Sequence, residues 1–153
     1  MTARLNILTV QSNLIPLFAE FSQKVIAAGL EKSVVELVKI RASQINGCAV
    51  CLRMHTRDAR KQGESEERLY MLDAWRESRL YTPRERAALA WTEALTLLAS
   101  SHAPDDVYAL VKAQFSDEES IALTMLINVI NGWNRLGVGY RRSDVDAPTA
   151  TAA

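Results

Sequence analysis

The sequence predicts an all-α fold, a single-domain bundle of about six to seven helices. Apolar residues recur at the spacing of one helix face through most of the 153 residues, and no segment alternates apolar and polar residues as a strand does. Six glycines and four prolines leave few places for tight turns. Hydrophobic residues make up 48% and charged residues 24%, which is the balance of an ordinary globular domain.

Seven segments have helical spacing, and short connections join them. Residues 143–153, rich in Asp, Ala, Thr and Pro, are expected to form a flexible tail, so that residues 1–142 make up one domain. The predicted helices cover about 13–28, 33–45, 47–62, 65–77, 83–99, 105–114 and 117–136.

The first two predicted helices each have one apolar face. Pro16 lies in the first turn of the first helix, where a missing N–H costs little, and Gly29 ends this helix. The second helix ends at Asn46-Gly47, and Asn46 is expected to cap the third helix. The residues expected to point inward are Leu14, Leu17, Phe18, Phe21 and Val25 from the first helix and Val34, Leu37, Val38 and Ile45 from the second.

The later helices have clear start signals. Acidic residues after Ser65 suit the positive end of the fourth helix. Thr-Pro-Arg-Glu at 82–85 places Thr at the N-cap, Pro at N1 and Glu at N3, and residues 116–119 form a second capping box. The two helices that follow these boxes are apolar on most sides. They must therefore be buried on several sides, either centrally within one chain or against a second copy of it.

Charge and hydropathy exclude several classes of function. Eighteen basic and eighteen acidic side chains cancel, so the sequence gives no electrostatic reason to bind nucleic acid or an anionic membrane surface. The longest dense apolar stretch, residues 121–130, is too short to cross a bilayer. The first residues lack the pattern of a signal peptide. We therefore expect a cytoplasmic protein with no nucleic-acid or membrane partner.

The residues that carry chemistry cluster in one short segment. The two cysteines, Cys48 and Cys51, enclose a loop too short for a disulfide to constrain much of the unfolded chain. In a reducing compartment this spacing indicates redox or metal chemistry. His55 falls on the same face of the predicted third helix as both cysteines. The opposite face carries Arg53, Arg57 and Arg60, which are expected to be solvated.

The start of a helix favours a reactive thiolate. Unpaired N–H groups and the positive end of the helix dipole stabilise the anion, and only the thiolate attacks peroxides or disulfides. Cys48 is nearer the helix start, which favours it as the thiol of lower pKa. Cys51 lies one turn before His55, which favours it as the thiol that the imidazole activates. The sequence leaves open which sulfur attacks first.

Glu36 is a fourth candidate residue. It lies twelve residues before Cys48 on the preceding predicted helix, which the Asn46-Gly47 turn folds back against the cysteine helix. A carboxylate there could orient His55 or relay a proton through water. Taken alone, however, a glutamate on a helix is more often a surface residue.

The segment 36–55 resembles the alkylhydroperoxidase D-like (AhpD-like) branch of the carboxymuconolactone decarboxylase superfamily. That branch has a Glu, an Ala-x-x-(Ile/Val)-Asn-x-Cys-x-x-Cys run and a His four residues after the second Cys, and all of these occur here in register. The segments 72–78 and 85–90 also look like members of the branch. The resemblance is strong over residues 34–62, and its combined motif is far more specific than a CxxC alone.

The resemblance implies an all-α fold, a homo-oligomer (trimer or hexamer) and thiol-dependent peroxidase or disulfide reductase activity. By motif position it assigns Cys48 and Cys51 as the redox pair and Glu36 and His55 as the proton relay. The expected substrate is a small hydroperoxide or a disulfide, and the expected reductant is a thiol or a lipoyl-bearing protein. We expect no cofactor and no metal.

One residue departs from the branch. The best-studied peroxidase members have a His immediately before the second cysteine, where this chain has Val50. Because valine cannot transfer protons, the relay is incomplete by comparison. Peroxide turnover is therefore expected to be slow, or the physiological substrate is another disulfide.

Other interpretations of the same residues remain open at this point. The cysteines could be buried and inert, or they could hold Zn²⁺ with His55 and a fourth ligand such as Glu36 or the predicted loop residue His102. The other branch of the superfamily performs decarboxylation or lactone chemistry, which needs no CxxC. The pair could also serve a non-enzymatic redox sensor, which turnover with peroxide and a reductant would distinguish from an enzyme.

Overall fold

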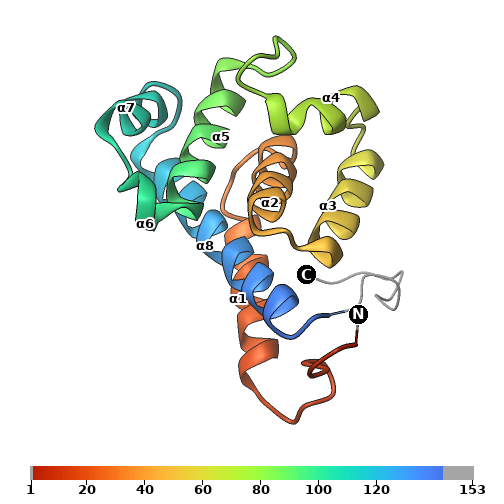
Figure 1. The fold of residues 1–153 in the computed structure, drawn as a ribbon. Helices are drawn as coiled ribbons and strands as arrows, with labels where there is room; N and C mark the ends of the chain where they lie inside the picture. The colour runs from red at the N-terminus through yellow and green to blue at the C-terminus, as the bar shows by residue number, and fades with distance from the viewer. Residues whose placement is uncertain (1, 143–153) are drawn as a thin grey trace.

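The computed structural model describes residues 2–142, and within this range all regular structure is helical (Figure 1). The all-α prediction is therefore confirmed, while the predicted tail at 143–153 lies outside the described residues. None of the described helices is long and apolar enough to cross a membrane. The elements are α1 (Leu14–Ile26), α2 (Lys32–Asn46), α3 (Ala49–Lys61), α4 (Glu66–Met71), the 3₁₀ helix η1 (Leu72–Ala74), α5 (Pro83–Thr96), α6 (Leu98–Ser101), α7 (Asp105–Gln114) and α8 (Asp117–Gly139).

Two of the predicted helices are each divided into two shorter elements. The predicted fourth helix changes to 3₁₀ geometry after Met71. The predicted fifth helix ends at Thr96, and α6 follows as a separate single turn. Residues 96–98, Thr-Leu-Leu, contain no glycine or proline, so the sequence carries no signal for this break. The described residues thus contain eight α-helices, where about six to seven were expected.

Both predicted capping boxes are present. The Thr82 hydroxyl accepts a hydrogen bond from the Glu85 N–H, and the Glu85 carboxylate accepts one from the Thr82 N–H. Ser116 and Glu119 make the same reciprocal pair at the start of α8. These boxes satisfy N–H groups that the first helical turn leaves without a backbone partner, so α5 and α8 begin where the local sequence predicts.

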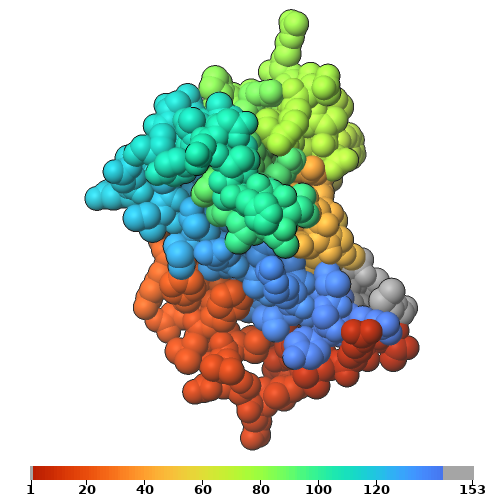
Figure 2. Space-filling model, turned by 60° about the vertical axis from the view of Figure 1, so that its left-hand side comes forward, coloured from red at the N-terminus to blue at the C-terminus, as the bar shows by residue number. Residues whose placement is uncertain are grey.

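The bundle is arranged around α2 and α8. In Figure 1, α2 stands between α3 on one side and α5 on the other, and α8 runs diagonally past all three. Helix α7 covers the outer side of α5 and α1 packs on α8. Figure 2 shows α1 and the residues before it forming one end of the molecule. The two helices expected to be buried on several sides, α5 and α8, are thus largely covered within a single chain.

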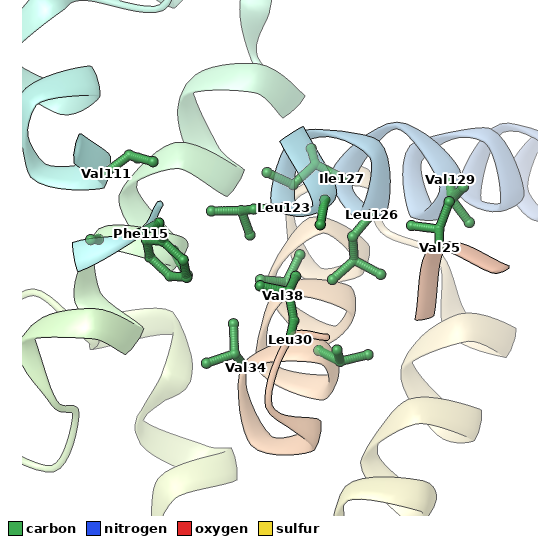
Figure 3. Close-up of a cluster of buried hydrophobic side chains, with 14 residues drawn as sticks. Val25, Leu30, Val34, Val38, Val111, Phe115, Leu123, Leu126, Ile127 and Val129 are labelled. Carbon is green, nitrogen blue, oxygen red and sulfur yellow. The ribbon is translucent and has the colours of Figure 1, made fainter. Parts of the chain in front are cut away.

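The larger core cluster lies mainly between α2 and α8, and α1, α5 and α7 add residues at its edges (Figure 3). Leu123, Leu126 and Ile127 of α8 are fully buried and face Val34 and Val38 of α2. A second cluster fills the space between α2, α3 and the η1 region, around Leu37, Ile40 and Leu72. These clusters fix α2 on both of its sides, so α2 provides a rigid support for any side chain that it directs toward α3.

The prediction for α1 is wrong for most of its apolar face. Phe18 packs on the ring of Trp133, with ring centroids 4.8 Å apart, and Trp133 donates a 3.0 Å hydrogen bond to Ser22. Helix α1 is apolar around more of its circumference than its single main neighbour, α8, can cover. The residues that were expected inside but are exposed are Leu14, Leu17 and Phe21.

Candidate redox site

The turn between α2 and α3 places the cysteines. Gly47 adopts the left-handed conformation, with φ of +65°, which a residue with a side chain adopts only at a cost. The Gly47 N–H bonds to Gln44 and the Cys48 N–H bonds to the carbonyl of Ser43, which closes the end of α2. Cys48 is consequently the N-cap residue of α3, and the predicted position of the CxxC at the start of this helix is confirmed.

Asn46 does not cap α3, contrary to the prediction. It is the last residue of α2, and its side-chain amide donates 2.9 Å hydrogen bonds to the side-chain oxygens (Oδ1) of Asn131 and Asn134 on α8. Asn134 in turn donates to the Ser43 hydroxyl at 3.0 Å. Burial makes an unpaired amide costly, so these three asparagines satisfy one another and fix α8 against the turn. Cys48 occupies the N-cap position of α3, and no side chain makes a capping hydrogen bond there.

The two cysteines are joined by a disulfide, and their Cα atoms are 5.4 Å apart. This separation is within the ordinary range for a disulfide. Both residues are buried in the single chain, with 1% of Cys48 and 4% of Cys51 exposed. The backbone therefore holds the pair in bonding distance, while access to the sulfurs requires some movement of what covers them.

Gly137 of α8 is part of that cover. A Cβ atom at this position would lie 2.8 Å from the Cys48 sulfur, 3.7 Å from the Cys51 sulfur and 3.3 Å from a methyl of Val50. The absence of a side chain at Gly137 thus allows the α8 backbone to pass directly over the disulfide. Gly137 was not among the residues predicted from the sequence, although a glycine inside an apolar helix is a recognised signal of close packing.

Glu36 and His55 meet between α2 and α3. His55 Nδ1 lies 3.0 Å from one carboxylate oxygen of Glu36, and Lys39 Nζ lies 3.1 Å from the other. All three side chains are buried. The interpretation of Glu36 as a surface residue is therefore wrong, because packing of α2 on α3 encloses its carboxylate. Lys39 was missed, since a lysine on a helix ordinarily indicates a solvated face.

The charge state of Glu36 determines the tautomer of His55. Burial alone would raise the pKa of Glu36, but the hydrogen bond and charge of His55 and the charge of Lys39 outweigh it, and the pKa lies below the ordinary value of 4.5. An ionised carboxylate only accepts hydrogen bonds, so His55 donates its Nδ1–H to Glu36. Nε2 is then the ring nitrogen that exchanges a proton with other groups.

The zinc interpretation gains no geometric support from the described residues. Within 2–142, no group of three or more His, Cys, Asp or Glu side chains is arranged to hold a metal ion. Both oxygens of Glu36, one suggested fourth ligand, are occupied by His55 and Lys39. The other suggestion, His102, is an exposed residue at the end of the short helix α6.

Sequence comparison places the chain among known proteins. A model of the carboxymuconolactone decarboxylase family matches residues 14–94. The chain is 46% identical to the uncharacterized protein YdfG of Bacillus subtilis over 111 residues, which cover 72% of this chain and 76% of YdfG. It is 32% identical to an uncharacterized protein of Mycobacterium tuberculosis over 113 residues, which cover 74% of this chain but only 38% of that longer relative.

Solved structures give the same placement. A crystal structure of a protein of unknown function from Agrobacterium tumefaciens, proposed there to be the antioxidant defence protein AhpD, matches with a TM-score of 0.90 and 40% identity. That match covers 93% of this chain and 97% of the other. The debrominase Bmp8 matches with a TM-score of 0.77 over 86% of this chain and 70% of its own, but at 18% identity the likeness concerns the fold alone.

We expect Gly137→Ala to lower the free energy of unfolding of the oxidised protein by about 1 kcal/mol, because the new methyl overlaps the Cys48 sulfur and must displace it. Gly139→Ala is the matched control in the same helix, since a Cβ there meets no atom within 4 Å. The control should be neutral or more stable by up to about 1 kcal/mol, as alanine favours helix. Urea unfolding measures both, and equal effects of the two substitutions would contradict the close contact.

Glu36→Gln should alter the acid dependence of stability in a defined direction. Because the folded-state pKa of Glu36 is lowered, its ionised form contributes stability that is present above pH 4.5 and is lost as the pH falls below 4.5 toward the folded-state pKa. The glutamine variant has no such contribution to lose. The difference in Tm between wild type and variant should therefore narrow below pH 4.5, and a difference independent of pH would show that Glu36 is not ionised in the folded protein.

Proposed function

Because this chain belongs to the carboxymuconolactone decarboxylase family, and within it to the AhpD-like branch, we propose that it is a thiol oxidoreductase that reduces hydroperoxides or disulfides through Cys48 and Cys51. One observation carries the proposal: a bridged cysteine pair starts the helix that also bears His55, whose imidazole is bonded to the buried carboxylate of Glu36. A nucleophile, a base and a group that orients the base are the recurring parts of an activated thiol site.

Peroxide reduction by this pair proceeds in two steps. A thiolate attacks the peroxide, so that an S–O bond forms, the O–O bond breaks, and the leaving alkoxide takes a proton to become an alcohol. The second thiol then attacks the resulting sulfenic acid. The S–S bond forms as the S–O bond breaks, and the hydroxyl leaves as water with the proton of the second thiol. The two thiols supply both electrons, and the product is the Cys48–Cys51 disulfide.

His55 is the proposed carrier of these protons. With Nδ1–H bonded to Glu36, its Nε2 accepts the thiol proton and returns it to the leaving oxygen. Lys39 supports this role because its ammonium, 3.1 Å from Glu36, favours the ionised carboxylate that holds the ring. Val50, between the cysteines, cannot transfer a proton. In this proposal the proton transfer therefore depends on His55, one turn after Cys51.

Regeneration requires an external dithiol, for which we propose a thiol or lipoyl-bearing protein. Its thiolate attacks one sulfur, the S–S bond breaks to give a mixed disulfide, and its second thiol releases the reduced pair. The burial of both cysteines requires the cover to open during this exchange. The C-terminal end of α8 is the proposed moving part, and it is tied down by Arg4, which donates to the carbonyls of Gly139 and Tyr140. We further propose a cytoplasmic location, where thiols stay reduced.

We also propose that the chain forms a homo-oligomer, a trimer or a hexamer, and that α1 lies in its interface. Soluble monomers rarely expose large contiguous apolar patches. Large exposed apolar side chains occur on the outer side of α1 and in the segment before it, at the end of the molecule seen in Figure 2. These residues are Leu5, Leu8, Val10, Leu14, Leu17 and Phe21.

The central test is turnover of a hydroperoxide with a dithiol reductant. Cys48→Ser and Cys51→Ser should each abolish turnover, since either change prevents the disulfide. His55→Ala should slow turnover by about 10²–10⁴-fold, the usual contribution of a general base. His102→Ala, which removes the other histidine of the chain, is the matched control and should leave turnover unchanged.

Mass spectrometry of the alkylated protein before and after stoichiometric peroxide gives an independent measurement. The peroxide-treated protein should carry no alkyl group at either cysteine. Full activity in the double Cys→Ser protein would end the proposal. Formation of the disulfide without any catalytic turnover would favour a redox sensor over an enzyme.

Leu14→Glu combined with Leu17→Glu should dissociate the oligomer, because two carboxylates would be buried in an apolar interface without partners. Light scattering coupled to gel filtration measures the molar mass. Leu110→Glu combined with Tyr108→Glu, two exposed apolar positions on α7, is the control and should leave the mass unchanged. A wild-type protein that runs as a monomer would refute this assembly.

A further inference from the structure

A pocket of about 290 Å³ lies behind Glu36, and the proposed mechanism has not used it. It opens between the start of α2, the end of α3 and the region around α4. The residues that line it are Lys32, Ser33, Glu36, Ala59, Gln62, Gly63, Glu64 and Arg68. Among the four candidate redox residues, Glu36 alone lines the pocket.

The pocket is separated from the sulfurs along α3. Cys51, His55 and Ala59 occupy successive turns on one side of this helix, and all three are buried. At 1.5 Å per residue, Ala59 lies about 12 Å along the helix axis from Cys51. A molecule in the pocket therefore cannot reach either sulfur directly, because His55 and Glu36 lie between, and the pocket is unsuited to hold the substrate of the cysteines.

The charges around the pocket favour water over an ionic ligand. Arg68 is paired with Glu64 at 2.7 Å and with Glu85 at 2.6 Å, so its charge is compensated within the wall. Glu36 is bonded to Lys39 on its own helix and to His55 on α3, while Lys32, Glu64 and Arg68 are the other charged residues of the pocket wall. The volume of the pocket far exceeds the roughly 10–15 Å³ that one water needs, and polar groups in its wall can bond to water.

The candidate residues follow one another in order from the thiols to the pocket. Cys51 precedes His55 by one turn, His55 Nδ1 is 3.0 Å from Glu36, and Glu36 borders the pocket. We propose that the pocket is the proton port of the redox site, a water-filled opening through which Glu36 exchanges protons with bulk solvent on behalf of His55. The inference rests on the proposed thiol chemistry and adds the path that its protons take.

The proton path is balanced at each atom. When a thiol ionises, its S–H bond breaks and an N–H bond forms at His55 Nε2. The imidazolium then passes the proton on Nδ1 to Glu36, and Glu36 passes a proton to water in the pocket. The ring ends as the neutral Nε2–H tautomer and Glu36 ends ionised, with one proton released to solvent and one thiolate formed. When Nε2 gives its proton to the leaving oxygen, a proton returns from water through Glu36 to Nδ1, which restores the Nδ1–H bonded to Glu36. Protonation of a thiolate during regeneration follows the same path in reverse.

The test blocks the pocket without touching the relay. Ser33→Trp and Gln62→Trp each place a large ring in the pocket from an exposed position on its wall. Lys61→Trp is the matched control, because it is exposed beside Gln62 but does not line the pocket. All proteins carry His102→Ala, so that the only histidine ring observed is that of His55.

The readout is the exchange rate of the His55 ring N–H with solvent, measured by ¹⁵N NMR in the oxidised protein. Both blocked variants should slow this exchange by about tenfold or more. The control should not change it, and backbone amide exchange in the core should be the same in all proteins. Equal ring exchange in blocked and control proteins would overturn the port. Because this measurement needs no turnover, a protein inactive toward peroxides but showing slowed exchange would refute the thiol peroxidase proposal and leave the port standing.

Discussion

The antiparallel packing of α2 on α3 is the constraint from which the site follows. The two helices are joined by a turn so short that Gly47 must take a left-handed conformation, and this fixes their relative register. In that register Glu36 from one helix faces His55 from the other, while the same turn delivers Cys48 to the N-cap. A different turn length would separate the carboxylate from the imidazole, because each residue inserted into a helix rotates its neighbours by about 100°.

The charged groups in this site are better explained by chemistry than by stability. Enclosing Glu36, Lys39 and His55 removes water from all three, and apolar side chains of similar volume often give an equally stable core. Their retention is understandable if the ionised carboxylate is needed to hold the ring through Nδ1 with its Nε2 directed to other groups. The same argument explains why the polar pocket lies beside Glu36, since a buried proton carrier without a route to solvent would exchange only when the protein opens.

Most of the local structure could be predicted from short-range sequence signals, and most of the tertiary contacts could not. The capping boxes at Thr82 and Ser116 and the position of the CxxC depend on neighbouring residues, and all were found in place. The face of α1 that is buried is the face that α8 covers. The apolar pattern of α1 does not determine this face, because apolar residues lie on more than one side of the helix. Asn46 has the chemistry of an N-cap residue, but two buried amides on α8 compete for it, and these lie far away in sequence.

The candidate site shows the same division between pattern and contact. Its four residues could be named from one motif, and the structure brings Glu36 and His55 into contact. Two residues of the site were missed. The role of Gly137 can be recognised only when α8 is known to cross the disulfide, and the role of Lys39 only when its helix is known to be enclosed. Helix α8 therefore has two opposing roles. Through its asparagines it fixes the turn that positions the thiols, and through Gly137 it closes over them. Any opening that admits a substrate must separate these contacts, by moving the end of α8 near Gly137 while the asparagines one to two turns earlier keep their bonds to the turn.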